Sequence, residues 1–279
     1  MGVVLVTGCN SGFGLATARV LAQRGDRVYA TVLASDPTGT ADIEAARAAG
    51  LPIEIVPLDV TDDPAAASLV ARIVADTGRI DGLVNSAGVS MFAAFEEVSI
   101  DDVRRMMEIN FIGPVRLMQL VLPHMRRQHA GRIVNVSSGA GFMPMAWQTA
   151  YVASKHALDG VSFGIGAEVR PFGIRVSIVS PGVFATGIGG KLWPASRASD
   201  EPSYAATVAE TLADWNQIVT GRDPALVAGA IAACLHSDDP PARVFVGRDC
   251  ERGAEQRRRL SDDEWADFIT RPMFRRRPA

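Results

Sequence analysis

The start of the chain holds the pattern that most narrows the possible folds: a short apolar run, a glycine-rich turn and a helix. Val3–Val6 is continuous and rich in β-branched residues, which predicts a strand buried on both faces. The turn Thr7–Gly14 spaces its glycines as G-x-x-x-G-x-G, and Leu15–Ala22 has helical character. Backbone amides in such a turn bind a pyrophosphate, and glycine lets the phosphate come close. We therefore predict a dinucleotide site here, although glycines also end strands for purely structural reasons.

Strand and helix patterns alternate along the rest of the chain. Further strands are predicted at residues 27–33, 53–58, 81–84, 132–137, 174–179 and 243–246. Helices are predicted at 41–49, 62–76, 100–128, 150–170 and 223–236, with Asp62 or Thr61 as the cap of the second. Pro114 and Pro123 are expected to bend the long helix 100–128. The alternation predicts one α/β domain over residues 1–279, a Rossmann-type, doubly wound parallel sheet flanked by helices.

Two segments depart from this alternation. Residues 183–222 are rich in glycine and proline, and a long loop inside a compact fold predicts a substrate lid after the sixth strand. Residues 251–279 form a C-terminal extension in which Ser261–Glu264 matches a capping box. The arginine run 275–277 is expected to be a solvated tail.

Composition limits the classes of partner. The chain has 279 residues, 48% of them hydrophobic and 21% charged, and a net charge of −3, which gives no reason to expect nucleic acid or an anionic membrane. Its three cysteines (Cys9, Cys234 and Cys250) are widely spaced, which argues against a disulfide framework or a zinc site and fits a reducing cytoplasm. No run reaches the roughly 18 apolar residues of a spanning helix. We expect a cytoplasmic protein without signal peptide, membrane span or bound metal.

The residues with catalytic potential follow the predicted strand 132–137. Tyr151 and Lys155 are four residues apart, so in a helix both project from one face. An ammonium beside a phenol favours the phenolate, and we expect it to lower the pKa of Tyr151 from about 10. Such a tyrosine exchanges a proton with a carbonyl or a hydroxyl group. Ser138, at the strand end, is placed to hydrogen-bond the same substrate oxygen. The Tyr-x-x-x-Lys pattern alone also fits an exposed helical pair.

The ends of other predicted strands add to the cofactor site. Asp59 and Val60 close the third strand, where an adenine would lie, and Asn85–Gly88 follow the fourth. In many dinucleotide folds a carboxylate at the end of the second strand bonds the ribose 2′-hydroxyl. Here no acid follows that strand until Asp36. This favours NADP(H) as the cofactor and leaves NAD(H) possible.

Together these motifs resemble the short-chain dehydrogenase/reductase family, in its T-G-x-x-x-G-x-G branch and its hydroxysteroid- and retinol-dehydrogenase-like members, over roughly residues 3–250. The resemblance implies a catalytic tetrad of Asn110, Ser138, Tyr151 and Lys155. It implies cofactor contacts from Gly8, Asn10, Ser11, Gly12, Phe13, Gly14, Asp59, Val60, Asn85, Ala87, Gly88, Tyr151, Lys155, Pro181, Gly182 and Thr186. The segment Asn85–Gly88 differs by one substitution from the N-N-A-G of the family.

The resemblance also implies a role for each member of the tetrad. Tyr151 would be the acid/base, and Lys155 would lower its pKa and hold the nicotinamide ribose. Ser138 would orient the substrate oxygen, and Asn110 would place a water that links Lys155 to solvent. The implied reaction interconverts a secondary alcohol and a ketone, or a primary alcohol and an aldehyde, with a nicotinamide cofactor.

Bulky apolar residues near the predicted site indicate a hydrophobic substrate. The expected pocket residues are Met91, Phe92, Phe142, Met145, Trp147, Phe184 and Trp193, with Phe95 and Met143 close by. The alternative is that several of these side chains only fill the core or the lid. Two other functions also stay open: an NAD(H)-preferring alcohol dehydrogenase, and a non-catalytic dinucleotide sensor on the same fold. Helices 101–128 and 150–170 correspond to the usual dimer surface of the family, so a homodimer or homotetramer is expected.

Overall fold

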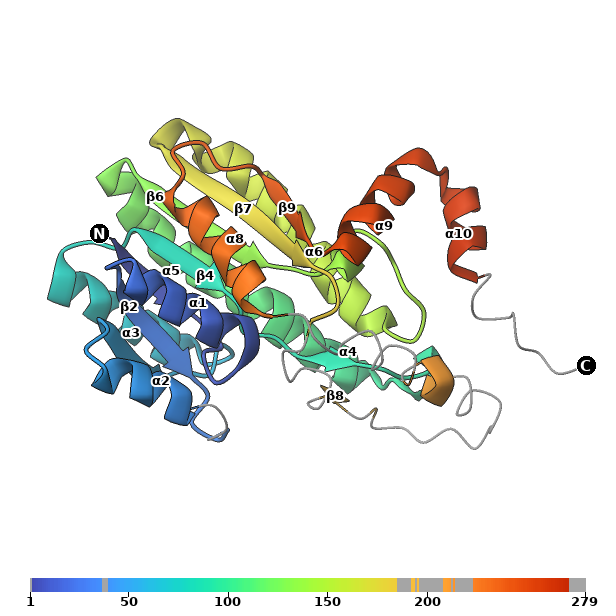
Figure 1. Ribbon diagram of the computed structural model, residues 1–279, viewed down its shortest axis with the longest axis horizontal. Coiled ribbons are helices and arrows are strands. Elements are labelled where there is room, and N and C mark those ends of the chain that lie inside the picture. The colour runs from blue at the N-terminus through green and yellow to red at the C-terminus, as the bar shows by residue number, and fades with distance from the viewer. Residues whose placement is uncertain are drawn as a thin grey trace, which may run out of the picture.

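Seven parallel strands form the central sheet of this computed structural model, in the order β3-β2-β1-β4-β6-β7-β9 (Figure 1). Their bounds are β1 Val3–Val6, β2 Arg27–Val32, β3 Ile53–Pro57, β4 Gly82–Asn85, β6 Gly131–Val136, β7 Ile174–Pro181 and β9 Arg243–Val246. Every pairing in the sheet is parallel, which confirms the predicted fold class. The structure describes residues 2–36, 40–184, 192–193, 195, 208–211, 213 and 223–270.

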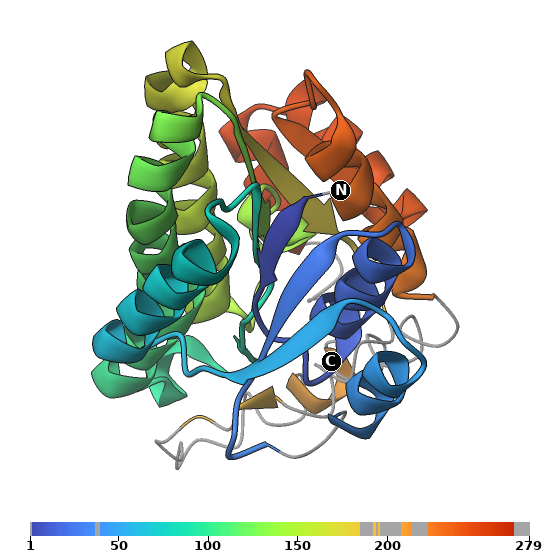
Figure 2. The same cartoon turned by 90° about the vertical axis from the view of Figure 1, so that its left-hand side faces the viewer.

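Helices cover both faces of the sheet, and Figure 2 shows them as two separate layers. One layer contains α1 (Gly12–Gln23), α2 (Thr40–Ala48) and α8 (Ala225–His236). The other contains α3 (Asp63–Thr77), α5 (Gly113–Gln128) and α6 (Thr149–Val169). Asp62 is the residue that caps α3, because its carboxylate accepts a hydrogen bond from the backbone N–H of Ala65 at 2.9 Å. None of the helices among the described residues has the length and apolar character needed to span a bilayer.

The two helical layers explain the continuous apolar runs of the strands. In β1, Val4 and Val6 pack with the side chains of α1, α2 and α8, whereas Val3 and Leu5 pack with those of α3 and α5. Successive side chains of a strand point to opposite faces, so a strand between two layers must be apolar at every position. All four residues of β1 are buried, as predicted.

The strand order creates a crevice at the carboxyl ends of β1 and β4. From β1 the chain builds β2 and β3 on one side, whereas β4 and the later strands extend the sheet on the other. The connections on either side of this point run to opposite faces of the sheet, which leaves an open crevice between them. The glycine-rich turn after β1 therefore lies at the position where sheets of this kind bind ligands.

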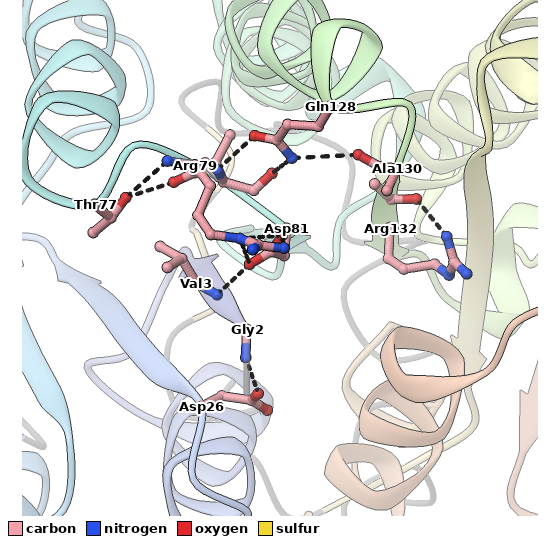
Figure 3. A network of polar contacts seen from close by, with 11 residues as sticks. Gly2, Val3, Asp26, Thr77, Arg79, Asp81, Gln128, Ala130 and Arg132 are labelled. Carbon is pink, nitrogen blue, oxygen red and sulfur yellow. Dashed lines mark hydrogen bonds and ion pairs between the residues drawn. The ribbon is translucent and has the colours of Figure 1, made fainter.

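Polar contacts join neighbouring segments at the amino ends of the strands, opposite the crevice (Figure 3). The carboxylate of Asp81 accepts a hydrogen bond from the N–H of Val3 at 2.7 Å and is held by the guanidinium of Arg79. The side-chain amide of Gln128 exchanges hydrogen bonds of 3.0 and 2.9 Å with the backbone of Ile80. These contacts fasten β1, β4 and the end of α5 to one another, away from the crevice.

The helix predicted over residues 100–128 is not continuous. It consists of α4 (Ile100–Met107), a π-helical segment η2 (Glu108–Ile112) and α5. Pro114 lies in the first turn of α5 and has no N–H to donate to the carbonyl of Asn110, while the N–H of Gly113 bonds the carbonyl of Glu108. The bend expected at Pro114 is therefore a wider, π-helical turn just before the proline. Asn110 lies in this turn and is completely buried.

The described part of the predicted C-terminal extension, up to Thr270, is helical. After β9 come α9 (Arg248–Arg259) and α10 (Asp262–Thr270), which stand out from the sheet (Figure 1). The capping box of α10 is confirmed: the N–H of Ser261 donates to Glu264 at 2.8 Å, and the N–H of Glu264 donates to the Ser261 hydroxyl at 3.3 Å. Helix α9 was not predicted, because its buried residues are only Cys250 and Ala254. The arginine run 275–277 lies outside the described residues.

Only part of the expected lid is described. Residues Leu192–Trp193 form the short strand β8, which pairs in parallel with β5 (Ser90–Met91). Ala195 packs against a cluster that contains Met91, Met106 and Tyr151. The rest of residues 185–222, apart from 208–211 and 213, is outside the described part of the chain.

Candidate active site

A cleft of about 510 Å³ lies at the carboxyl ends of β1, β2, β3 and β4. It is lined by Gly8, Asn10, Ser11, Gly12, Phe13, Leu33, Ser35, Asp36, Leu58, Asp59, Val60, Ser86, Ala87, Gly88, Val89, Arg105 and Ile109. Most of the residues predicted to contact a cofactor are in this set. Gly14, Asn85, Tyr151, Lys155, Pro181 and Gly182 are not, and Thr186 lies outside the described residues.

The first turn of α1 opens into this cleft. Its amide N–H groups have no carbonyl acceptor within the helix, the side chain of Ser11 does not cap them, and the turn has no acidic residue. Gly8 has φ +72°, and a Cβ atom there would lie 2.7 Å from the Cα of Ala87. A Cβ atom on Gly14 would lie 2.3 Å from the carbonyl oxygen of Gly8. Gly14 therefore lets α1 pack on the turn, and the free amides and helix dipole suit an anion.

Two polar side chains hold the turn in place. The amide of Asn10 accepts a hydrogen bond from the N–H of Leu33 at 2.7 Å and donates to the carbonyls of Leu33 and Asp36 at 3.3 and 2.5 Å. The hydroxyl of Thr7 accepts hydrogen bonds from the N–H groups of Ser86 and Ala87, both at 3.0 Å. Asn10 thus joins the turn to the end of β2, and Thr7 joins it to the segment after β4.

The two predicted strand-end contacts differ in their positions. Asp59 faces the cleft, and one of its carboxylate oxygens accepts hydrogen bonds from the N–H and hydroxyl of Thr61 at 2.9 and 2.8 Å. The side chain of Asn85 lies on the face of the sheet that α5 and α6 cover, where its amide donates to the side chain of Asn135 at 2.8 Å. Its backbone register between β4 and β6 explains this orientation, since Asn85 is opposite Asn135.

Tyr151 and Lys155 lie on the same face of α6, as their spacing predicted. Both are buried, with exposed fractions of 8% and 5%. The Lys155 ammonium donates to the carbonyl of Val136 at 3.0 Å and lies 5.8 Å from the centre of the Tyr151 ring. Ser138, which follows β6, hydrogen-bonds the phenol, and its hydroxyl accepts from the N–H of Ala140 at 3.2 Å. The fold thus brings the three residues together, and the exposed-pair alternative is wrong.

The pKa of Tyr151 is raised, whereas the sequence alone predicted a lowered value. Burial raises the pKa of Tyr151 above its ordinary value, the hydrogen bond from Ser138 opposes this, and the negative charge of Asp159 adds to it. Burial also lowers the pKa of Lys155 to about 8, with Asp159 acting in the opposite direction. Burying the Tyr151 phenolate or the Lys155 ammonium costs more free energy than the attraction between the two charges returns. The ammonium faces the ring of Tyr151 and the carbonyl of Val136.

Asn110 connects α6 to the cleft. Its carbonyl oxygen accepts from the N–H of Val89 at 2.9 Å, and its amide donates to the Val89 carbonyl at 2.9 Å and to the Ser154 hydroxyl at 3.0 Å. Ser154 in turn donates to the carbonyl of Tyr151 at 2.7 Å. A Cβ atom on Gly88 would lie 3.1 Å from Asn110 Oδ1 and 3.6 Å from Lys155 Nζ. The segment after β4 therefore touches both the cleft and the tetrad.

The residues predicted to line a substrate pocket do not form one group. Met91 packs with Ala93, Met106, Ala140 and Tyr151, which places it beside the phenol. Phe184 belongs to the core on the side of the sheet covered by α1, α2 and α8, and its ring centre is 5.6 Å from that of Phe13. Phe142 packs against Phe245 at 5.4 Å, Phe92 is half-buried, and Met145 is 40% exposed. Trp147 has φ +63°, and its carbonyl accepts from the N–H of Ala93 at 2.8 Å. The side chain of Trp193 is outside the described part.

Several residues of the site were not identified from the sequence. Leu33, Ser35, Leu58, Val89, Arg105 and Ile109 line the cleft, and Ser154 joins Asn110 to α6. Their only sequence signal is position: Leu33 and Leu58 end predicted strands, Ser35 and Val89 come a few residues after a strand end, and Ser154 is one helical turn past Tyr151. Arg105 and Ile109 lie within the predicted helix 100–128.

Comparisons with known proteins agree with this architecture. A family profile described as short chain dehydrogenase matches residues 2–197. The 3-ketodihydrosphingosine reductase of Bacteroides thetaiotaomicron is 32% identical over 247 residues, which cover 88% of this chain and 87% of the relative. Estradiol 17-beta-dehydrogenase 1 of Rattus norvegicus is 33% identical and covers 87% of this chain and 73% of the relative. Retinol dehydrogenase 8 of Bos taurus is 32% identical, with coverage of 86% and 80%.

Solved structures have the same fold. A short-chain dehydrogenase from Streptomyces avermitilis superposes with a TM-score of 0.83 at 34% identity and covers 99% of this chain and 98% of that one. A metagenomic short-chain oxidoreductase in complex with NADP superposes with a TM-score of 0.69 at 28% identity, with coverage of 88% and 96%.

Proposed function

The chain belongs to the short-chain dehydrogenase/reductase family, and on that premise we propose that it interconverts a ketone and a secondary alcohol, or an aldehyde and a primary alcohol, on a hydrophobic substrate. The observation that carries this proposal is the grouping of half-buried Ser138 with buried Tyr151 and Lys155, joined through Asn110 to the segment that lines the cleft. A nicotinamide cofactor, when bound, supplies or accepts the hydride.

The residues of the cleft fit a dinucleotide. The open amides at the start of α1 would hold the pyrophosphate, and Gly8 keeps the turn within contact of Ala87. Asp59 and Val60 would lie beside the adenine. Pro181 and Gly182, at the end of β7, would meet the nicotinamide carboxamide, and Lys155 would meet the adjoining ribose.

The proton chemistry falls to Tyr151. Because burial raises its pKa, the phenol is protonated near neutral pH and is suited to donate a proton to a carbonyl oxygen. Ser138 would hydrogen-bond the same oxygen and stabilise negative charge that develops there. Lys155 would stabilise the phenolate that remains after the proton transfer. Asn110 would hold Val89 and Gly88 in place relative to α6 during this transfer.

Replacing Tyr151 by phenylalanine tests the proposal, because the ring stays and the proton is lost. We expect turnover of a hydrophobic ketone to fall by about 10²- to 10⁴-fold while dinucleotide binding is retained. Tyr29→Phe is the matched control, since Tyr29 is also buried but lies in β2, within the α3 and α5 layer. Near-normal turnover by Tyr151→Phe would refute the assignment. A wild-type chain that binds dinucleotide but turns over no substrate would favour the sensor alternative.

A hydrophobic substrate is supported by Met91 beside Tyr151 and by the strand β8, which brings the predicted lid next to Met91. The relatives named above are called after a ketosphingoid base, estradiol and retinol, all of which are hydrophobic. A substrate panel of sterols, retinoids, long-chain ketones and small polar sugars tests this point. A preference for the sugars would contradict it.

For the cofactor, we keep NADP(H) as the proposal. The end of β2 has no carboxylate before Asp36, and a structural neighbour is described in complex with NADP. One observation favours NAD(H): Asp36 lines the cleft, where a carboxylate would repel a 2′-phosphate. Separate titrations with NADPH and NADH distinguish the two. If NADH binds more tightly and Asp36→Ala reverses the order, the NAD(H) alternative is correct.

Assembly and location remain proposals too. Gly160 and Gly164 on α6 have open space beside them and Phe163 is 51% exposed, which supports a close homodimer or homotetramer contact through α5 and α6. A monomeric mass by sedimentation at micromolar concentration would contradict it. The three cysteines are buried and free, in keeping with a reducing cytoplasm.

A further inference from the structure

A buried ion pair lies behind the proposed catalytic residues. Asp159 is on α6, one turn after Lys155, and only 4% of it is exposed. Its carboxylate is 2.7 Å from the guanidinium of Arg243 in β9, whose side chain is 12% exposed. A buried carboxylate is costly unless it is paired, so this contact links the catalytic helix to the last strand of the sheet.

The carboxylate also packs against the segment that carries Ser138. A Cβ atom on Gly141 would lie 2.6 Å from the hydroxyl of Ser137 and 2.7 Å from Asp159 Oδ2. A Cβ atom at this position would require the side chain of Ser137 or Asp159 to move. Burial raises the pKa of Asp159, and Ser137, Arg243 and Lys155 oppose this shift by stabilising the charged form.

Arg243 is held from several sides. Its guanidinium carbon lies 5.3 Å from the ring centre of Phe142, 5.3 Å from that of Phe163 and 5.6 Å from that of Phe245. Arg258 of α9 lies over two of the same rings, at 5.7 and 5.3 Å. Cation–π contacts of this kind restrain the guanidinium beyond its single ion pair. The partner of Asp159 is therefore fixed in position.

The electrostatic surroundings of Lys155 contain few charges. From α6 it faces Tyr151 and Asp159, and Arg243 of β9 stands behind Asp159. Its other polar neighbours, the Val136 carbonyl of β6 and Asn110 of η2, are neutral. Among the described groups, Asp159 is the carboxylate whose charge acts on both Tyr151 and Lys155.

We propose that Asp159, held by Arg243, is a positioning residue that keeps the Ser138 segment against α6 and supplies negative charge behind Tyr151 and Lys155. It touches neither substrate nor cofactor and acts through these neighbours. The inference rests on the proposed function, since it assigns a role within the same site.

Asp159→Asn tests the role, because asparagine keeps the shape and one acceptor oxygen and removes the charge. Loss of the negative charge favours both the phenolate and the neutral amine. The ionisations in the pH profile of kcat/KM should therefore move to lower pH by about 0.5–1 unit, with dinucleotide affinity unchanged. Asp239→Asn is the matched control: Asp239 pairs with Arg170 and Arg175 but is exposed, so its profile should match that of the wild type.

An activity-independent measurement separates this inference from the proposed function. The ultraviolet titration of Tyr151, obtained as the difference between each protein and its Tyr151→Phe variant, should show a lower pKa in Asp159→Asn. Asp159→Asn combined with Arg243→Met covers the case in which the single variant fails to fold, since it leaves no unpaired buried charge. An unchanged titration in the variant that folds would overturn the inference, even if Tyr151→Phe abolishes turnover. A shifted titration supports it, even if no substrate is found.

Discussion

The carboxylate of Asp249 occupies the space that a side chain at Gly182 would need. A Cβ atom on Gly182 would lie 2.4 to 2.6 Å from the carboxylate atoms of Asp249, and Oδ2 accepts a hydrogen bond from the N–H of Val183 at 2.9 Å. The N–H of Gly182 donates to the carbonyl of Val246 at 2.8 Å. The start of α9 and the end of β9 therefore hold the backbone after β7, which we propose meets the nicotinamide.

Gly182→Ala should disturb this contact. Because the carboxylate must move or lose its bond to Val183, we expect a loss of about 1–3 kcal/mol in the free energy of unfolding and weaker dinucleotide binding. Urea unfolding and a fluorescence titration measure the two effects. Gly229→Ala in α8 is the matched control, since nothing lies within 4 Å of the added Cβ, and it should stabilise the helix. Equal stability of the two variants would contradict the role of Asp249.

Asn110→Ala should destabilise the fold as well as the site. It leaves the N–H and carbonyl of Val89 without their side-chain partner, at a cost of about 1–3 kcal/mol for each group left unpaired and buried. Urea unfolding of the variant measures the loss. Met106→Leu is the control, because Met106 also contacts the Asn110 amide but a similar apolar volume replaces it. A loss no larger than that of the control would show that Val89 finds other partners.

Burial of Lys155 predicts a specific dependence of stability on pH. The pKa of Lys155 falls from 10.5 to about 8 on folding. Below this value both the folded and the unfolded chain carry the ammonium, so the cost of burying the charge is fully present. Between the two values the folded chain has released the proton and the unfolded chain has not, so stability rises with pH.

Comparison with Lys155→Met isolates this contribution. The stability of the wild type relative to the variant should increase by about 2 kcal/mol between roughly pH 7 and pH 10. Urea unfolding across this range provides the values. Tyr151, whose pKa burial raises, acts in the opposite direction at higher pH, so the range ends there. Parallel curves for the two proteins would mean that Lys155 stays solvated.

Gly88→Ala should affect catalysis more than stability. The added Cβ would lie 3.1 Å from Asn110 Oδ1, so the Asn110 side chain must shift by a few tenths of an ångström, and 3.6 Å from Lys155 Nζ, which is an ordinary van der Waals contact. We expect turnover to fall by about tenfold, because displacement of positioned groups is costly. Gly160→Ala on α6, where the added Cβ meets nothing within 4 Å, is the control. Steady-state kinetics on both variants provide the test, and full activity of Gly88→Ala would contradict it.

The sequence was sufficient wherever the determining interactions are local. The apolar run of β1, the capping box before α10 and the Asp62 cap of α3 depend on a few neighbouring residues, and all were predicted. Tyr151 and Lys155 share a face because helical geometry relates positions four apart. The parallel sheet followed from the alternation of strands and helices.

Contacts between distant segments decided the rest. Asn85 is predicted to contact the cofactor, and the position of its side chain, on the sheet face covered by α5 and α6, comes from its register opposite Asn135. The expected lowering of the Tyr151 pKa fails because burial, which no local pattern reports, outweighs the nearby ammonium. Asp159 and Arg243 are far apart in sequence, and only the packing of α6 against the last strand joins them. Sequence patterns carry the period of a helix or strand, whereas burial and pairing arise only once the layers pack together.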